Sequence, residues 1–231
     1  MELKEKKILI TGGTSGLGFS VAKSLIKKGC LVNVIGRSED NIKKAKKIIS
    51  SKSFKAFKGD VRNYEEIKRI TDKVGRIDIL INNAGVWLKG KLQDYSCSKI
   101  DEIIDVNLKG VIYTTKLVLP GMIKRNEGFI LNVSSTSGIT PKNEQTVYCA
   151  SKYGVTGFTN SLKKDLLSTN IKVAGFYPGG MKTKLFEKAG MPIKNKNWME
   201  PDKVAKVIIF ILEQDDQELI IDHLVLNRRR E

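Results

Sequence analysis

Short apolar stretches and longer segments of helical spacing alternate along the whole chain. The apolar stretches have the length and β-branched character of strands and lie at 7–10, 31–35, 54–57, 78–81, 129–133, 172–176 and 219–226. The segments between them repeat apolar residues every three or four positions, which predicts helices at 17–28, 38–50, 63–74, 98–105, 108–124, 146–167 and 201–213. Ser38 and Asn63 are expected to cap two of these helices, and Pro201 to begin the last.

This alternation predicts βαβ units and therefore an α/β fold, a Rossmann-type doubly wound parallel sheet with helices on both faces. The chain has 231 residues and no linker rich in Pro, Gly or Ser, so we expect a single domain over 1–231. Ligands bind such sheets beyond the carboxyl ends of the strands. The residues that directly follow each strand are therefore the candidates for a functional site.

A glycine-rich segment follows the first predicted strand and precedes a helix. Its glycines allow a tight turn and the close approach of a pyrophosphate, and the helix N-terminus offers free N–H groups with a partial positive charge. A purely structural turn is the alternative, and the strand-turn-helix context favours the binding site. The candidate contacts are Gly12, Thr14, Ser15, Gly16, Leu17 and Gly18.

The glycine spacing is G-x-x-x-G-x-G, which resembles that of the short-chain dehydrogenases and reductases. Asp60-Val61 follows the third predicted strand, where that family contacts adenine, and N-N-A-G at 82–85 follows the fourth, as in the family signature. The resemblance implies a nicotinamide dinucleotide cofactor. The further contacts it implies are Asp60, Val61, Asn83, Ala84 and Gly85.

The residues after the second strand bear on the choice between NAD and NADP. An NAD site usually has an acidic residue there for the ribose hydroxyls. Gly36 stands at that position, and Arg37 and Ser38 follow as a cationic partner and a hydroxyl donor for a 2′-phosphate. We therefore expect NADP(H) in preference to NAD(H). Ser15 argues the other way, because some NADP-binding relatives carry Lys or Arg there, and an ordinary surface arginine is the alternative for Arg37.

Tyr148 and Lys152 match the family pattern Y-x-x-x-K. Residues four apart share one face of a helix. The ammonium of Lys152 is therefore expected to lie near the phenol of Tyr148 and to lower its pKa from an ordinary value of about 10. A general acid or base works best with a pKa near the operating pH. Alone, this pattern is common by chance and usually marks a helix surface, so its weight comes from the motifs around it.

Ser135 lies thirteen positions before Tyr148, the family spacing for the serine that binds the substrate oxygen, and Ser134 is the alternative. Asn107 resembles the family asparagine that holds a water in the proton relay, with a structural asparagine between two helices as the alternative. By the same resemblance, Lys152 also binds the nicotinamide ribose. A P-G-x-x-x-T segment is implied to cover the nicotinamide with Pro178, Gly179, Met181 and Thr183.

These motifs together predict an enzyme that interconverts a small, mainly apolar ketone or aldehyde and an alcohol by hydride transfer. Tyr148 is the expected general acid/base, assisted by Lys152, Ser135 and Asn107. The candidate substrate pocket, under a lid over 184–200, comprises Trp87, Leu88, Ile139, Thr140, Met181, Leu185, Phe186, Met191 and Trp198, with ordinary packing of the lid as the alternative for each. We also expect a homodimer or homotetramer, with an apolar helix face made of Leu108, Val111, Val118, Leu162 and Leu166.

Charge suggests a rival function. The chain has 41 basic and 25 acidic residues, a net charge of +16, which attracts polyanions. Its lysines are spread along the chain and are not interleaved with aromatic residues as in a stacking platform. A nucleic-acid-binding protein is therefore the weaker alternative. A non-catalytic NADP(H)-sensing protein is the other, and the intact catalytic motifs argue against it.

Other chemistries find little support in the sequence. Cys30, Cys97 and Cys149 form no metal or redox motif and are expected to be buried, reduced thiols. The only histidine, His223, lies in a predicted strand, so we expect no metal site. No apolar run approaches the length of a membrane span, and the N-terminus carries no targeting pattern. A cytoplasmic protein without a membrane partner is expected.

Overall fold

Seven parallel strands form one sheet in the computed structural model, which describes residues 2–187, 189, 198–214 and 221–227. The strands are β1 (Lys7–Thr11), β2 (Leu31–Gly36), β3 (Phe54–Lys58), β4 (Ile79–Asn82), β5 (Gly128–Val133), β6 (Ile171–Pro178) and β7 (His223–Leu226). Their order across the sheet is β3-β2-β1-β4-β5-β6-β7. Every residue of β4 and β5 is buried, as expected of strands that are covered on both faces. The predicted doubly wound α/β fold is confirmed.

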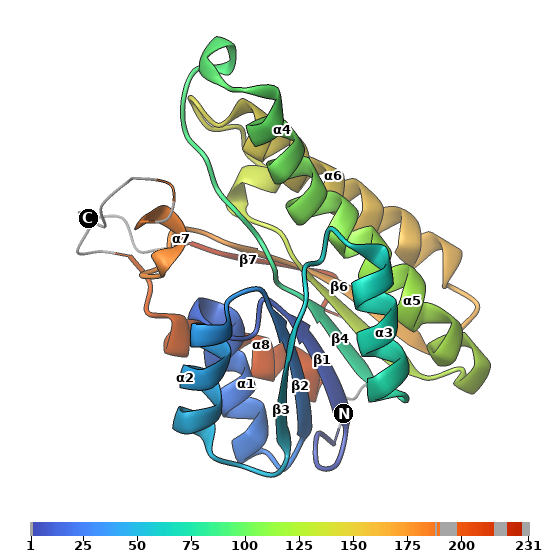
Figure 1. Ribbon diagram of the computed structural model, residues 1–231. Helices are drawn as coiled ribbons and strands as arrows, with labels where there is room; N and C mark the ends of the chain where they lie inside the picture. The colour runs from blue at the N-terminus through green and yellow to red at the C-terminus, as the bar shows by residue number, and fades with distance from the viewer. Residues whose placement is uncertain (1, 188, 190–197, 215–220, 228–231) are drawn as a thin grey trace.

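Helices cover both faces of this sheet (Figure 1). They are α1 (Gly16–Lys27), α2 (Glu39–Ile49), α3 (Tyr64–Val74), α4 (Cys97–Ile104), α5 (Gly110–Arg125), α6 (Thr146–Asp165), α7 (Lys184–Glu187) and α8 (Pro201–Glu213). Side chains alternate along β1, so Ile8 and Ile10 pack in a core with α1 and α8, while Leu9 packs with α3, α5 and α6 on the other face. No helix among the described residues is long and apolar enough to cross a bilayer.

The expected helix starts are present. The side chain of Ser38 accepts a hydrogen bond from the Asn41 N–H, and that of Asn63 accepts one from the Glu66 N–H, so each satisfies a backbone donor in the first turn. Pro201 is the first residue of α8, where a missing N–H costs nothing. β7 begins at His223 and is shorter than the predicted strand 219–226, of which 219 and 220 lie outside the described residues.

Two predictions about α4, α5 and α6 are wrong. The separate helices expected at 98–105 and 108–124 run continuously through a π-helical turn, Asp105–Lys109, because the turn inserts one residue without ending the helix. The apolar face expected for dimerisation is largely internal. Val118, Leu162 and Leu166 belong to the core beneath the sheet, and Val111 is also buried.

The sheet order places a binding crevice at the carboxyl end of β1. The chain moves outward through β2 and β3 on one side of β1 and through β4 to β7 on the other. Thr11 is in register with Ile35 of β2 and with Asn82 of β4, so the loops that follow these three strands lie side by side. This is the switch point at which sheets of this kind bind ligands.

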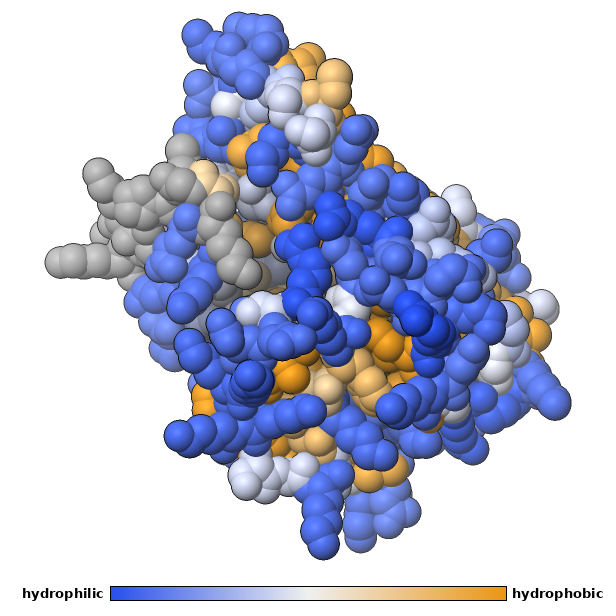
Figure 2. Space-filling view, viewed as in Figure 1, coloured by the Kyte–Doolittle hydropathy of each residue, from blue (hydrophilic) through white to orange (hydrophobic). Residues whose placement is uncertain are grey.

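The outer surface of the face drawn in Figure 1 is mostly hydrophilic. Figure 2 shows this face, with apolar residues exposed between α2 and α3.

Candidate active site

A cavity of about 1720 Å³ lies at the carboxyl ends of the strands. The loops after β1 to β6 all contribute to its lining, as does Asn227 after β7. The site residues predicted from the sequence that line it are Gly12, Thr14, Ser15, Gly16, Leu17, Arg37, Ser38, Val61, Asn83, Ala84, Gly85, Ser135, Tyr148, Lys152, Pro178, Gly179, Met181 and Thr183. Gly18, Asp60 and Asn107 are not among the lining residues.

The glycine turn after β1 packs against the loop after β4. Gly12 has a φ of 66°, and a Cβ there would lie 2.8 Å from the Cα of Ala84. A Cβ on Gly18 would come within 2.6 Å of the Gly12 carbonyl oxygen, so Gly18 allows the helix to start close to the turn. Asn83 joins the two loops by donating from Nδ2 to the carbonyls of Thr11 and Gly12 at 3.0 and 3.1 Å. At Gly12 and Gly18 the turn has room only for backbone atoms. A pyrophosphate could therefore approach the main chain closely here.

The residues after β2 meet the glycine turn. A Cβ on Gly36 would overlap the hydroxyl of Thr14, so the position that an NAD site gives to an acidic residue has no space for a side chain here. Arg37 is half exposed and lies 3.9 Å from a Glu102 oxygen. The Ser38 hydroxyl accepts the capping hydrogen bond of α2, which leaves its proton available to a ligand.

Asp60 is already engaged by a neighbour. Its carboxylate binds the Arg62 guanidinium, with contacts as short as 2.7 Å. Burial raises the pKa of Asp60, but hydrogen bonds and charge from Arg62 hold that pKa below its ordinary value. Val61, the next residue, lines the cavity and is buried. An adenine at this end of the cavity would therefore meet Val61 rather than the Asp60 carboxylate.

Tyr148 and Lys152 lie one helical turn apart on α6 and are almost fully buried, at 6% and 5% exposed. The Lys152 ammonium is 5.9 Å from the centre of the Tyr148 ring and donates to the Val133 carbonyl at 3.2 Å. Burial lowers the pKa of Lys152 to about 8, because the charged form is desolvated. The sequence motif thus brings the two groups together inside the cavity.

The pKa of Tyr148 moves in the direction opposite to the one expected. Burial raises it to about 12, and the nearby Ser135 hydroxyl lowers it by a smaller amount. The expectation of a lowered Tyr148 pKa is therefore wrong. The cause is that α6 buries both groups, and desolvation disfavours charge on each of them. A protonated Tyr148 is the form present at neutral pH.

The two adjacent serines after β5 have different environments. Ser134 donates its hydroxyl proton to the Lys152 carbonyl at 3.0 Å, within α6. Ser135 accepts from the Ser137 N–H at 3.1 Å, which fixes its oxygen at the cavity wall. Since that bond uses only an acceptor position, the Ser135 hydroxyl can still donate to a substrate.

Asn107 lies in the π-helical turn and is fully buried. Its Oδ1 accepts from the Val86 N–H at 2.8 Å, and its Nδ2 donates to the Val86 carbonyl at 3.0 Å and to Ser151 Oγ at 3.1 Å. The side chain thus ties the loop after β4 to α5 and α6. It positions the cavity wall and uses both polar atoms of its amide for that purpose.

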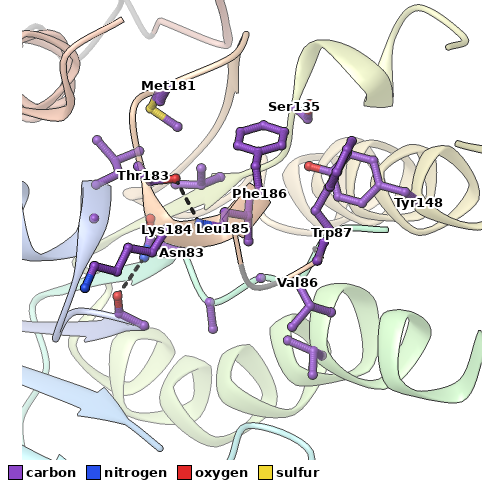
Figure 3. A pocket seen from close by; sticks show the side chains of 18 of the residues that line it. Asn83, Val86, Trp87, Ser135, Tyr148, Met181, Thr183, Lys184, Leu185 and Phe186 are labelled. Atoms are coloured by element: carbon purple, nitrogen blue, oxygen red, sulfur yellow. Dashed lines mark hydrogen bonds between the residues drawn. The ribbon is translucent and has the colours of Figure 1, made fainter. Parts of the chain in front are cut away.

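Aromatic side chains enclose the end of the cavity near Tyr148. Figure 3 shows Trp87 and Phe186 projecting into the same space as Tyr148. The ring of Phe186 lies 4.7 Å from that of Trp87 and 4.3 Å from that of Trp198, measured between centroids. The predicted pocket residues that line this end are Trp87, Leu88, Met181, Leu185, Phe186 and Trp198.

Some pocket predictions differ from the structure. Ile139 and Thr140 do not line the cavity, because the short 3₁₀ turn Thr136–Gly138 after β5 directs the chain away from it. Met191 and most of the predicted lid lie outside the described residues. Sequence reasoning also missed Gln145 and Lys142, which line the cavity. The available signal was their place in the segment that leads into the Tyr148 helix, three and six positions before Tyr148.

Cysteine and histidine take no part in this site. Cys30 and Cys149 are buried, as expected, whereas Cys97 is exposed because it begins the surface helix α4. His223 lies on β7 and hydrogen-bonds Asn160 at 2.8 Å. Within the described ranges no three His, Cys, Asp or Glu side chains are placed to bind a metal ion.

Comparisons with known proteins agree with this geometry. A family model described as short chain dehydrogenase matches residues 6–192. An uncharacterized oxidoreductase of Staphylococcus epidermidis is 32% identical over 217 residues, covering 92% of this chain and 93% of its own. A second uncharacterized oxidoreductase, from Staphylococcus aureus, is 34% identical over 216 residues with the same coverage.

Solved structures extend the likeness to three dimensions. The closed form of a serine dehydrogenase complexed with NADP⁺ superposes with a TM-score of 0.88 at 29% identity, covering 96% of this chain and 93% of the other. A variant of actinorhodin polyketide ketoreductase with NADPH gives a TM-score of 0.85 at 27% identity, covering 96% and 95%. The fold and the site define an NAD(P)-dependent dehydrogenase or reductase. The chain belongs to the short-chain dehydrogenase/reductase family and is an oxidoreductase that acts on carbonyl and alcohol groups.

Proposed function

We propose that the protein is an NADP(H)-dependent reductase of a small ketone or aldehyde, with Tyr148 as the general acid. The observation that carries this proposal is the group formed by Tyr148, Lys152 and Ser135 in one wall of the cavity. The reaction converts a carbonyl compound, NADPH and a proton to an alcohol and NADP⁺. The reverse reaction uses the same groups with Tyr148 as the base.

Support for a dinucleotide comes from the turn after β1, where Gly12 and Gly18 leave space that a Cβ would fill. The residues that would hold its phosphates are in this turn and at the N-terminus of α1. Support for NADP comes from Gly36 and Arg37. The first excludes an acidic side chain, and the second places a guanidinium at the cavity wall, where it would pair with a 2′-phosphate. The NADP⁺- and NADPH-bound relatives point to the same cofactor.

The proposed chemistry assigns one task to each side chain. The nicotinamide supplies the hydride. Ser135 donates a hydrogen bond to the carbonyl oxygen and stabilises the negative charge that develops there. Tyr148 then transfers its phenolic proton to that oxygen, and its raised pKa keeps this proton in place at neutral pH. Lys152 lies beside Tyr148 and would stabilise the phenolate that remains.

Asn107 is proposed as a positioning residue. Its side chain holds Val86, and therefore the loop that carries Trp87, against the helices. We also expect a cytoplasmic homodimer or homotetramer folded as a single domain over 1–231. These points stay predictions, and analytical ultracentrifugation of the purified protein measures the oligomeric state.

The experiment that tests the proposal follows the absorbance of NADPH with a panel of small ketones, aldehydes and quinones and repeats it with NADH. We expect oxidation of NADPH that depends on the carbonyl compound, with a higher kcat/KM than for NADH. A preference for NADH would contradict the cofactor assignment. Firm binding of NADPH with no turnover across the panel would instead favour a cofactor-sensing protein.

A further inference from the structure

The orientation of the Gln145 carboxamide is fixed by its neighbours. Its Oε1 lies 3.3 Å from Trp87 Nε1 and 3.3 Å from Ser137 Oγ. An indole N–H can only donate, so the side of the amide that faces Trp87 must be its oxygen. The NH₂ group therefore points elsewhere, and it donates to no residue in the part of the chain that the structure describes. Gln145 also lines the cavity, three residues before Tyr148.

The loop that carries Gln145 is clamped to the loop after β4. Glu144 has a φ of 57°, a left-handed conformation that is strained for a residue with a side chain. Its carbonyl accepts from the Gly90 N–H at 2.8 Å and from the Tyr95 hydroxyl at 3.3 Å. Its carboxylate pairs with Lys89 at 3.0 Å. These contacts hold the backbone in place and engage the one acidic side chain next to Gln145.

The surroundings of this amide are electropositive. Among the residues that the structure describes, Glu102 is the only acidic residue that lines the cavity, and it lies at the other end with Arg37 and Lys99. Lys142, three positions before Gln145, lines the cavity, and Lys184 lines it on the side of Asn83 (Figure 3); neither forms an ion pair with any residue that the structure describes. A free amide donor in a cavity that is also lined by two unpaired lysines suits an anionic group on a ligand.

Next to this polar group the cavity is lined by aromatic rings. The rings of Trp87, Phe186 and Trp198 pack in sequence along one wall. The indole of Trp87 also holds the amide of Gln145, so the apolar wall and the donor belong to one rigid unit. A ligand that fits both parts carries an apolar, preferably aromatic, substituent and an anionic group close to each other.

We propose that the substrate is a ketone or aldehyde with a carboxylate close to the reacting carbonyl, and that the Gln145 NH₂ group binds this carboxylate. Gln145 directly precedes α6 and Tyr148 lies in the first turn of that helix, so both side chains reach the cavity from the same short segment. Tyr148 then reaches the carbonyl oxygen while Gln145 reaches the acid. The inference rests on the proposed function and names its substrate class.

A matched series of ketones tests the inference. Benzoylacetate has the carboxylate, ethyl benzoylacetate masks it as an ester, and butyrophenone lacks it. The dissociation constant of each is measured by calorimetry with the protein saturated with NADP⁺, because a ketone and an oxidised cofactor cannot exchange hydride. We expect benzoylacetate to bind at least about tenfold more tightly than the other two, since a hydrogen bond to a charged group contributes this much or more.

Two substitutions separate recognition from structure. Gln145→Glu keeps an oxygen for Trp87 and Ser137 but replaces the donor with a negative charge, so the preference for the acid is expected to be lost or reversed. Gln145→Leu removes both functions and is expected to reduce the preference about tenfold. Asn143→Leu is the control, because Asn143 is an exposed amide nearby that does not line the cavity. Its acid-to-ketone ratio is expected to match that of the wild type.

The outcomes distinguish this inference from the proposed reaction. Equal dissociation constants for acid and ester in the wild type overturn the inference, as does an acid preference that survives in Gln145→Glu. The proposed reaction still stands in either case if NADPH reduces the ketones. A preference for the acid that depends on Gln145, without reduction of any of the three, supports the inference and counts against the proposed reaction.

Discussion

The hydroxyl of Thr14 occupies the space that a side chain on Gly36 would need. Thr14 belongs to the glycine turn after β1, and Gly36 ends β2, so the contact joins the two segments that would hold the adenosine half of a dinucleotide. It gives a steric reason for the absence of an acidic residue at position 36. Cofactor choice in this chain is therefore coupled to the glycine turn as well as to Arg37.

Gly36→Asp alone is predicted to weaken NADPH binding at least tenfold without creating an NADH site. The new side chain must displace Thr14 and would place its carboxylate near the 2′-phosphate. The double variant with Thr14→Gly removes the overlap and is predicted to gain NADH affinity. Fluorescence titration with both cofactors measures the effect. A single variant that binds NADH as tightly as the wild type binds NADPH would contradict the steric argument.

Arg37→Ala is predicted to raise the dissociation constant for NADPH by about tenfold to a hundredfold and to change that for NADH by less than about threefold. The reason is the loss of charge-assisted hydrogen bonds to the 2′-phosphate, which contribute about 1.5–3 kcal/mol. Arg62→Ala is the matched control, because Arg62 pairs with Asp60 and does not line the cavity. Equal losses for the two cofactors would show that Arg37 does not recognise the phosphate.

The buried Lys152 predicts a pH-dependent stability. Its pKa is about 8 in the folded protein and 10.5 ordinarily, so between these values the unfolded chain binds more protons than the folded chain. The free energy of unfolding contributed by this group therefore rises with pH. Relative to Lys152→Met, the wild type is predicted to gain about 2 kcal/mol between pH 8 and pH 10. Urea unfolding of both proteins at several pH values measures this, and parallel pH profiles would refute the shift.

Asn107→Leu is predicted to destabilise the protein by about 3 kcal/mol. The substitution leaves the partly buried N–H and carbonyl of Val86 and the buried oxygen of Ser151 without their side-chain partner, and an unsatisfied buried group costs about 1–3 kcal/mol. Asn160→Leu is the control, because Asn160 is exposed and bonds only the exposed His223 among the residues described. Its effect is expected to stay within about 0.5 kcal/mol. Chemical denaturation of the two variants compares them, and similar midpoints would contradict the positioning role of Asn107.

The sequence predicted the elements whose signals are local. Strand-forming runs gave the sheet, and the caps Ser38 and Asn63 and the first residue Pro201 are where the sequence put them. Motif residues that follow the strands meet in one cavity because parallel strands bring their carboxyl ends to one edge. The position of a motif directly after a strand can be recognised from the sequence alone.

Properties that depend on burial were not readable in the same way. The sequence placed Lys152 beside Tyr148, but the sign of the Tyr148 pKa shift follows from how deeply α6 is packed. The π-helical turn at Asn107 has no periodic signature, because one inserted residue changes the helix without ending it. Gln145 was missed because its direction is set by Trp87, a residue 58 positions away.

Ketone reduction by Tyr148→Phe under saturating NADPH, with the NADPH dissociation constant determined in parallel, decides whether Tyr148 is the general acid. The phenyl ring fills the same buried space but has no proton to give. We predict a fall in kcat of at least a hundredfold, because general acid catalysis contributes about 10²–10⁴-fold, with cofactor binding changed by less than about threefold. A variant that keeps the wild-type kcat would show that Tyr148 is not the acid and would contradict the mechanism.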